Sequence, residues 1–304
     1  MTVMIADADS GPRSPNLHPK FSLKQTVGAL DSKTLCDYIA SQTGLSKSKI
    51  KDALNKGAAW LKKKGGHRRR VRRASTALNP GDSLEFYYDA RLLERHPPQG
   101  RCLHDYQRFS VWYKPSGLLS QGTLYGDHCA LLRQAEIFFR FRRPVYLVHR
   151  LDREASGLLL IAHRQDAAAV LSRLFRDHRV LKSYRIEVLG DLSQVAPSDT
   201  IALPLDGQNA VTEFEVSHYD PRAQTSTVAV TLKTGRRHQI RRHFEMIGFP
   251  VMGDPRYGRG NKDPAGMRLV ATALAFRCPF RHKELAFTLA FDANALLDSR
   301  APGE

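Results

Sequence analysis

The stretch that most constrains the fold runs from Val145 to His163 and reads VYLVHRLDREASGLLLIAH. An apolar lead-in is followed by a charged cluster around Asp152, a small-residue turn, and an unbroken apolar run at 158–162. An apolar run bounded by glycine and charged residues is typical of a strand that is buried on both faces. The sequence therefore predicts a core strand, with Asp152 on the loop that leads into it.

Asp152 is a candidate nucleophile. Arg150 and Arg153 stand beside it in the sequence, and guanidinium groups can keep a partly desolvated carboxylate ionised. An ionised carboxylate that is shielded from water is a usable nucleophile. On these residues alone, a surface aspartate in an arginine-rich turn is an equally good interpretation.

The overall charge indicates a polyanionic partner. The 304 residues carry a net charge of +17, although their 42% hydrophobic and 25% charged content is ordinary. Such an excess favours nucleic acid as the partner before a membrane. No apolar run approaches the roughly 20 residues that a membrane span requires, and the N-terminus lacks the features of a secretory signal. The four cysteines lie far apart, which predicts free thiols and a cytoplasmic protein.

The positive charge is concentrated between Lys47 and Arg73, where 12 Lys or Arg residues accompany one acid, Asp52. We expect the most basic part to be a flexible tip that binds RNA. Its residues are Lys62, Lys63, Lys64, Arg68, Arg69 and Arg70. Such residues neutralise phosphates without reading the base sequence. A solvated basic linker is the alternative interpretation.

The elements around this segment predict a small separate module. One short helix follows Thr34, a second begins at Ser46, which is a good N-cap, and a strand follows the turn at 79–82. This order resembles the small RNA-binding module named after a small-subunit ribosomal protein (S-four-like), with one strand replaced by the basic insertion. We expect a loose arm at 1–20, this module at 21–94, a hinge at 95–102 and the larger domain at 103–298.

The larger domain contains more predicted strands than helices. Strands are indicated at 109–115, 182–188, 212–216, 227–232, 269–276 and 285–291, and a helix with a regular apolar face at 167–175. This pattern predicts an α+β fold with a mixed, largely antiparallel central sheet and flanking helices. Tyr184 lies on the strand that follows the helix and can return beside Asp152, although a strand tyrosine is more often a packing residue.

A second basic region, Thr234–His243, leads into a predicted helix. Arg236, Arg237 and Arg241 lie near the helix start, where anions are attracted. His238 and His243 have no third ligand nearby, so we expect no metal site. No phosphate-binding or dinucleotide glycine motif occurs, so we expect no nucleotide cofactor.

Several ordered motifs resemble those of the RluA-type pseudouridine synthases. They are the Tyr-Lys-Pro-Ser-Gly opening that contains Lys114, the His149-Arg150-Leu151-Asp152 loop, Tyr184, the Thr234–Arg241 segment and Gly253-Asp254. The resemblance covers about 109–291. One departure is Ala155, which stands where the family pattern has a threonine.

The resemblance implies a cofactor-free isomerase that converts uridine to pseudouridine within RNA after flipping the base out of its stack. Asp152 matches the catalytic aspartate, Tyr184 the tyrosine that packs on the target base, and Arg241 the arginine that pairs with the aspartate. Arg150 matches a side chain that fills the gap left by the flipped base. We assign substrate binding to Lys114, His149, Arg150, Arg236, Arg237, His238 and Ile240. The basic module favours rRNA over tRNA, and we expect a monomer.

Two other functions compete with this interpretation. One is a glycoside hydrolase acting on nucleic acid, because Glu154 lies close to Asp152 and could complete a carboxylate pair. The other is a non-catalytic RNA-binding or ribosome-assembly factor, which the basic segment by itself would explain. Free uracil as the product would identify the first, and a dispensable Asp152 the second.

Overall fold

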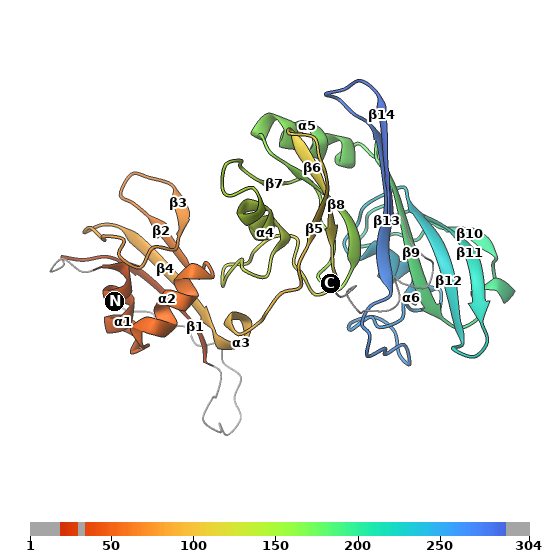
Figure 1. Ribbon diagram of the computed structural model, residues 1–304. Helices are drawn as coiled ribbons and strands as arrows, with labels where there is room; N and C mark the ends of the chain where they lie inside the picture. The colour runs from red at the N-terminus through yellow and green to blue at the C-terminus, as the bar shows by residue number, and fades with distance from the viewer. Residues whose placement is uncertain (1–18, 30–33, 290–304) are drawn as a thin grey trace, which may run out of the picture. The chain divides into compact units, whose positions relative to one another are not determined.

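The computed structural model describes residues 19–29 and 34–289, which form two compact units (Figure 1). Of the described residues, the first unit comprises 19–29, 34–97 and 121–133, and the second comprises 98–120 and 134–289. Segment 121–133 thus groups with the first unit, whereas the sequence placed it within the larger domain. Most of the predicted N-terminal arm and the end of the predicted strand at 285–291 lie outside the described residues.

The first unit is a four-stranded antiparallel sheet with helices, in the strand order β1-β4-β2-β3. Its elements are β1 (Lys20–Thr26), α1 (Leu35–Thr43), α2 (Lys47–Asn55), β2 (Ala59–Lys62), β3 (Arg68–Val71), β4 (Ser83–Asp89) and α3 (Ala90–Leu93). The predicted cap is confirmed, because the Ser46 hydroxyl accepts a hydrogen bond from the Lys49 amide at the start of α2. Ile39, Ile50, Leu61 and Phe86 belong to one apolar core between the helices and the sheet.

The residues predicted to form a flexible basic tip belong to a β-hairpin. Residues 59–71 form the β2–β3 hairpin, and β2 pairs with β4. The guanidinium groups of Arg68 and Arg70 lie 4.3 and 4.2 Å from the ring centroid of Trp60, so cation–π contacts and ladder hydrogen bonds order this segment. A relation to the ribosomal-protein module stays a prediction.

Segment 121–133 is attached to the first unit by polar contacts with the hairpin. The Asp127 carboxylate forms ion pairs with Arg70 and Arg72, and Trp60 Nε1 donates to the Leu124 carbonyl at 3.1 Å. Arg70 also donates to the carbonyls of Gly57 and Thr123. Some of the basic hairpin side chains are therefore bound within the protein.

The second unit is built on a ten-stranded mixed sheet, with the main order β10-β11-β12-β9-β13-β8-β6-β5 and with β14 and β7 as branches. Its elements are β5 (Arg101–Asp105), β6 (Phe109–Lys114), β7 (Tyr146–Leu147), β8 (Ser156–Ala162), α5 (Gln165–Arg176), β9 (Leu181–Leu189), the short 3₁₀ helix η1 (Leu192–Gln194), β10 (Ser198–Ile201), β11 (Thr212–Asp220), β12 (Thr225–Leu232), α6 (Gln239–Met246), β13 (Leu269–Arg277) and β14 (Glu284–Thr288). Helix α4 (Leu131–Phe138) begins at the end of segment 121–133 and continues into this unit.

The predicted fold class is confirmed. The paired strands are antiparallel except for β8 and β13, which run parallel. β8 is the predicted core strand, and Leu158 through Ala162 are at most 1% exposed. Helix α5 packs against β8 and α6 against β11. None of the helices in the described part of the chain has the length and apolar character of a membrane span.

Candidate active site

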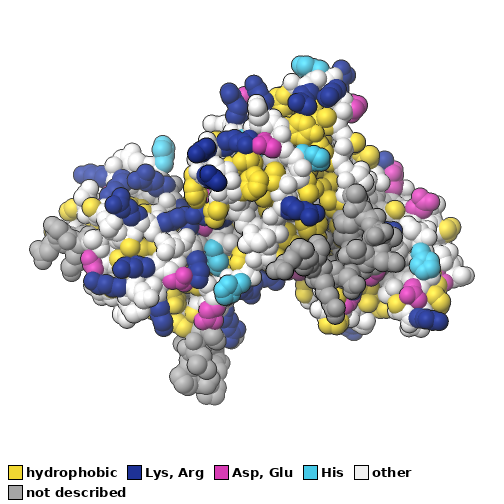
Figure 2. Space-filling model, viewed as in Figure 1, with side chains coloured by type: hydrophobic (Ala, Val, Ile, Leu, Met, Phe, Trp, Pro, Cys, Tyr) yellow, Lys and Arg dark blue, Asp and Glu magenta, His cyan; other side chains and the backbone are white. Residues whose placement is uncertain are grey.

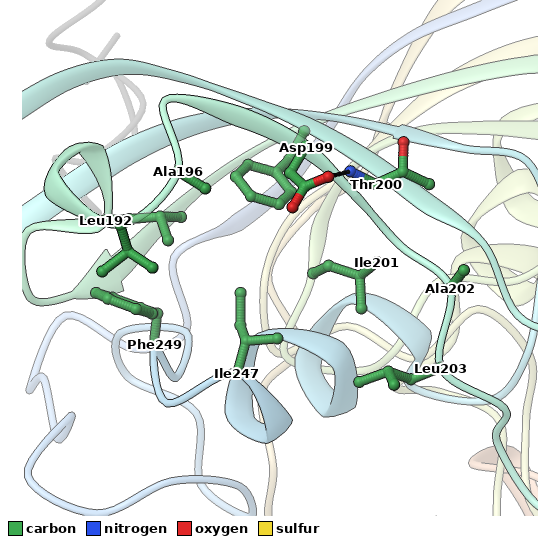
Figure 3. A pocket seen from close by; sticks show the side chains of 11 residues that line it. Leu192, Ala196, Asp199, Thr200, Ile201, Ala202, Leu203, Ile247 and Phe249 are labelled. Carbon is green, nitrogen blue, oxygen red and sulfur yellow. Dashed lines mark hydrogen bonds between the residues drawn. The ribbon is translucent and has the colours of Figure 1, made fainter.

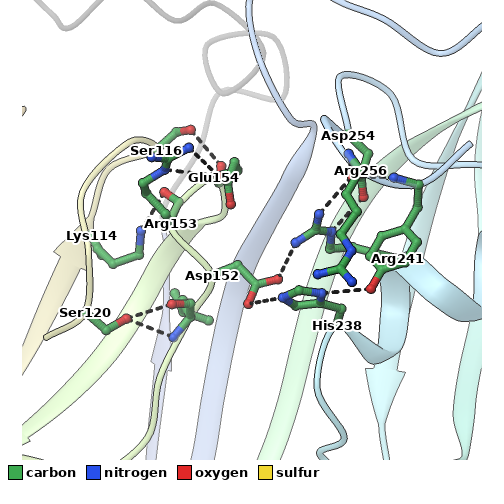
Figure 4. Close-up of polar contacts among 12 residues, drawn as sticks. Lys114, Ser116, Ser120, Asp152, Arg153, Glu154, His238, Arg241, Asp254 and Arg256 are labelled. Atoms are coloured by element: carbon green, nitrogen blue, oxygen red, sulfur yellow. Dashed lines mark hydrogen bonds and ion pairs between the residues drawn. The ribbon is translucent and has the colours of Figure 1, made fainter. Parts of the chain in front are cut away.

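Asp152 lies on the loop before β8, and its carboxylate meets side chains from the start of α6 (Figure 4). Arg241 Nη1 donates to Asp152 Oδ2 at 2.8 Å, and His238 Nε2 lies 3.6 Å from Oδ1. The Asp152 side chain is 24% exposed, whereas that of Arg241 is 3% exposed. The site thus presents a solvent-accessible carboxylate that is oriented by a buried guanidinium.

Arg241 is itself held by a second carboxylate. Its Nε and Nη2 donate to the two oxygens of Asp254 at 2.6 and 2.8 Å, and the Asp254 side chain is fully buried. Burial by itself lowers the pKa of the Arg241 guanidinium, but its hydrogen bonds to Asp254 and Asp152 raise the pKa on balance. A bidentate pair of this kind fixes the guanidinium plane, so Arg241 points its remaining donor at Asp152.

His238 completes this side of the cluster. It has a left-handed backbone with φ of 54° just before α6, and its Nδ1 lies 3.0 Å from the Tyr257 hydroxyl. Burial lowers the pKa of the imidazole, and this effect outweighs the opposing charge of Asp152. His238 is therefore neutral at physiological pH, and Arg241 supplies the positive charge at the Asp152 carboxylate.

The backbone on either side of Asp152 is held by the segment that follows β6. The Ser120 hydroxyl donates to the Leu151 carbonyl at 2.7 Å and accepts from the Leu151 amide at 3.1 Å. The Gly117 amide donates to the Arg153 carbonyl at 2.7 Å. Figure 4 shows Ser120 on the side of the loop away from Arg241. These hydrogen bonds thus support the loop through its backbone and do not involve the Asp152 carboxylate.

Lys114 belongs to this support. Its side chain is fully buried, and Nζ donates to the carbonyls of Pro115, Leu118 and Arg153 at 3.1, 2.7 and 3.3 Å. Burial lowers the pKa of the Lys114 amine to about 7, against the opposing charges of Asp152 and Glu154. The geometry therefore gives Lys114 a loop-supporting contact in place of the substrate contact that we assigned from the sequence.

Tyr184 reaches the same level of the sheet as the Asp152 loop. Ala271 of β13 pairs with Gly157 of β8 on one side and with Tyr184 of β9 on the other. A Cβ on Gly157 would lie 2.3 Å from the Ala271 carbonyl oxygen, so this close strand approach requires glycine. Burial, and then the negative charge of Asp152, raise the pKa of the Tyr184 phenol, which therefore stays neutral.

The other predicted substrate-binding residues are not all brought to the carboxylate. Arg150 and Arg237 are exposed, and Arg236 Nε donates to the Asn209 carbonyl at 2.9 Å. His149 stacks on Phe175, with ring centroids 4.2 Å apart, and accepts the Leu160 amide through Nε2. Ile240 is 4% exposed. His149 and Ile240 therefore contribute to packing around the site.

The expectation that Arg153 accompanies the Asp152 carboxylate is wrong. Arg153 forms an ion pair with Glu154, at 2.9 Å between Nη2 and Oε1. Adjacent side chains in this loop point in different directions, so the neighbour of Asp152 in the sequence is not the cation that pairs with its carboxylate. Glu154 is occupied by Arg153, and the geometry gives no support to a carboxylate pair with Asp152.

The six predicted RNA-binding residues of the hairpin fall into two groups. Lys62, Lys64 and Arg69 are exposed. Lys63 binds the buried Asp82 carboxylate at 2.7 Å, and Arg68, which is also exposed, pairs with Glu85 at 2.7 Å. Arg70 contacts Asp127, as described above. Lys62, Lys64 and Arg69 are the better placed of the six to contact a phosphate backbone.

Three contributing residues were absent from the sequence-based assignment: Ser120, Asp254 and Tyr257. Asp254 stood in a quoted motif, and an aspartate in a glycine-proline turn gave no sign that it would pair with Arg241. Ser120 and Tyr257 act through contacts between distant segments, for which the sequence carried no signal.

A separate apolar pocket of about 290 Å³ lies between η1, β10 and the end of α6 (Figure 3). Leu192, Ile201, Phe214, Ile247 and Phe249 are among its lining residues, and none of the lining residues belongs to the Asp152 cluster. Across residues 19–29 and 34–289, no group of three or more His, Cys, Asp or Glu side chains could hold a metal ion.

Comparisons with known proteins identify the family. The sequence model described as RNA pseudouridylate synthase matches residues 108–246. An uncharacterized RNA pseudouridine synthase of Mycoplasma pneumoniae is 27% identical over 296 residues, which span 89% of this chain and 93% of that protein. The dual-specificity RNA pseudouridine synthase RluA of Pasteurella multocida is 32% identical over 216 residues, which span 65% of this chain and 97% of that protein.

A solved structure shows the same fold. The human RNA pseudouridylate synthase domain containing 1 superposes with a TM-score of 0.56 at 22% identity, covering 67% of this chain and 90% of that one. The match to the Pasteurella multocida enzyme shows the family as well as the fold, because it is 32% identical and spans 97% of that protein. The chain therefore belongs to the RluA-type family of RNA pseudouridine synthases.

Proposed function

We propose that this isomerase uses Asp152 to convert a uridine in structured ribosomal RNA to pseudouridine. The reaction breaks the bond between N1 of uracil and C1′ of ribose and forms one between C5 and C1′. C5 loses a proton and N1 gains one, so substrate and product have the same composition. No electron acceptor or donor enters this balance.

The pairing of Asp152 with Arg241 is the observation that carries the proposal. Cleavage at C1′ develops positive charge on the sugar, which a carboxylate stabilises or traps. The 2.8 Å contact occupies Asp152 Oδ2, and Oδ1 has His238 at 3.6 Å. Since the side chain is 24% exposed, a ribose can approach it.

The surrounding groups suit a neutral base. The raised pKa of Tyr184 keeps the phenol uncharged, so its ring offers an apolar face to uracil. His238 lies next to the carboxylate with a lowered pKa. Uracil within a stacked helix is out of reach of such a site, so the target base must be flipped out. We assign Arg150, which is exposed two residues before Asp152, to the gap that the base leaves.

The preference for ribosomal RNA rests on the first unit. Its exposed Lys62, Lys64 and Arg69 add a basic surface beyond the catalytic unit, and such a surface suits a large structured RNA. The test is to map pseudouridines in ribosomal and transfer RNA from cells with and without the gene. Loss of a transfer-RNA site alone would contradict the assignment to ribosomal RNA.

Replacing Asp152 by Asn tests the catalytic assignment. We expect pseudouridine formation to fall to background while RNA affinity stays near normal, because the amide keeps the shape and loses the negative charge. Glu154→Gln is the matched control, since Glu154 is bound to Arg153 and should be dispensable. Nucleoside analysis should find pseudouridine and no free uracil. Residual turnover in Asp152→Asn, or its loss in Glu154→Gln, contradicts the proposal.

A further inference from the structure

A group of exposed aromatic and basic side chains lies at the end of α4, apart from the Asp152 cluster. Ile137, Phe138 and Phe141 are 54%, 59% and 62% exposed, and Arg140 and Arg142 between and beside them are also exposed. We call these five residues the aromatic–arginine surface. Figure 2 shows hydrophobic and basic side chains next to one another over the part of the view where Figure 1 draws α4.

The backbone that presents these side chains is well defined. Arg140 and Phe141 both have left-handed backbones, with φ of 51° and 57°. Their amides donate to the carbonyls of Ile137 and Glu136, each at 2.8 Å. Two consecutive left-handed residues other than glycine are uncommon and need surrounding structure to hold them. The exposure of Phe141 is therefore a property of an ordered turn.

The ring of Phe138 packs against two other aromatic rings. It meets Trp112 edge-on, with ring centroids 5.3 Å apart, and Phe139 at 5.0 Å. Trp112 is 1% exposed and lies on β6 two residues before Lys114, which hydrogen-bonds to the Asp152 loop. Two residues of a strand span about 6.7 Å, so this surface and the catalytic loop rest on the same strand.

We propose that the aromatic–arginine surface binds unpaired nucleotides of the substrate RNA that flank the target uridine. Exposed rings stack with any base whose face is free, and arginines between them neutralise the phosphates. A duplex hides its base faces, so it cannot use the rings. The inference rests on the family's action on RNA and adds a second contact region to the catalytic pocket.

The charge favours RNA over an apolar protein partner. Three arginines, Arg140, Arg142 and Arg143, lie within four positions of the sequence, and the phosphates of RNA complement such a concentration of positive charge. Arg143 is already bound to Asp105 through two contacts and lies over Phe139. Arg140 and Arg142 remain exposed next to the rings, which gives the surface a net positive charge.

The test compares full-length variants in their affinity for a short oligouridylate and for an RNA duplex of the same length. We expect Phe138→Ala/Phe141→Ala to weaken oligouridylate binding about tenfold for each ring and to leave duplex binding unchanged. Phe138→Trp/Phe141→Trp should keep the affinity of the unmodified protein, because tryptophan rings also stack on bases. Val195→Ala is the matched control, since Val195 is 72% exposed in the same unit and lies apart from α4.

Two further variants keep the proposal falsifiable if the alanine variant is unstable. Phe141→Leu keeps an apolar side chain without a ring, and we expect it to lose about tenfold in affinity, as the loss of one ring predicts. Retained affinity in Phe141→Leu would overturn the proposal and would indicate an apolar docking surface. Arg140→Gln/Arg142→Gln should reduce the salt dependence of oligouridylate binding by about 1.4 in slope. An unchanged slope would also overturn the proposal.

Discussion

At the scale of single residues, Arg241 connects the Asp152 carboxylate to a buried one. Its guanidinium makes two hydrogen bonds to Asp254 and one to Asp152. The two roles differ physically, because the contact with Asp254 is fully buried and the contact with Asp152 is partly open to solvent. A substitution at Arg241 therefore affects both stability and chemistry.

We expect Arg241→Ala to lower both the turnover number and the free energy of unfolding. It leaves the buried Asp254 carboxylate with only two amide donors, and an uncompensated buried charge costs about 3–5 kcal/mol. Arg242→Ala is the matched control, because Arg242 pairs with Asp206, which is 73% exposed. Thermal unfolding and single-turnover rates of both variants are the measurements. Equal stability losses in the two variants would contradict this account of Arg241.

At the scale of elements, the segment after β6 determines the shape of the Asp152 loop. Ser120 and Gly117 hydrogen-bond to the backbone on both sides of Asp152 and leave its side chain untouched. Ser120 is 5% exposed, so water cannot easily replace its hydroxyl. We therefore regard Ser120 as a positioning residue for Asp152.

Ser120→Ala should lower kcat while KM changes little, because the loop loses its support and the binding groups remain. Two backbone groups of Leu151 lose a partner, which costs about 1–3 kcal/mol in stability. Ser116→Ala is the matched control, since Ser116 donates to the Glu154 carbonyl at an exposed position. Steady-state kinetics should show no comparable drop in kcat for the control. A rise in KM alone in Ser120→Ala would indicate a substrate contact.

At the scale of the whole molecule, positive charge is divided between internal contacts and exposed positions. Lys63 and Arg70 are bound to Asp82 and Asp127, whereas Lys62, Lys64 and Arg69 are exposed on the same hairpin. The count of 47 Lys and Arg residues therefore overstates how many cations a bound RNA can reach.

Replacing Lys62, Lys64 and Arg69 by Gln should flatten the salt dependence of binding to single-stranded RNA by about 2 in slope. Lys63→Gln should leave this slope unchanged and lower the unfolding temperature, because the Asp82 carboxylate is only 2% exposed. Titrations at several salt concentrations and thermal unfolding measure the two effects. The same slope for the triple variant and the unmodified protein would mean that the hairpin does not contact RNA.

Local patterns predicted the elements well where short-range physics decides them. The capping serine at 46, the apolar run of β8 and the amphipathic helix α5 are as expected, because each depends on neighbours within a few residues. The basic hairpin was missed for the opposite reason. The hairpin is stabilised by the pairing of β2 with β4 and by the contacts of two arginines with the Trp60 ring. A run of Lys and Arg in the sequence gives no sign of either contact.

The sequence by itself determined that Asp152 precedes a buried strand, that Tyr184 lies on the strand after the next helix, and that the chain is strongly basic. Only the tertiary structure decided which cation meets the carboxylate. Arg153 is adjacent and pairs with Glu154, whereas Arg241, separated from Asp152 by 89 positions, makes the contact. The physical reason is that sequence proximity fixes only the neighbours of Asp152 along the backbone. The cation that contacts its carboxylate is set by the tertiary packing that buries Arg241 against Asp254.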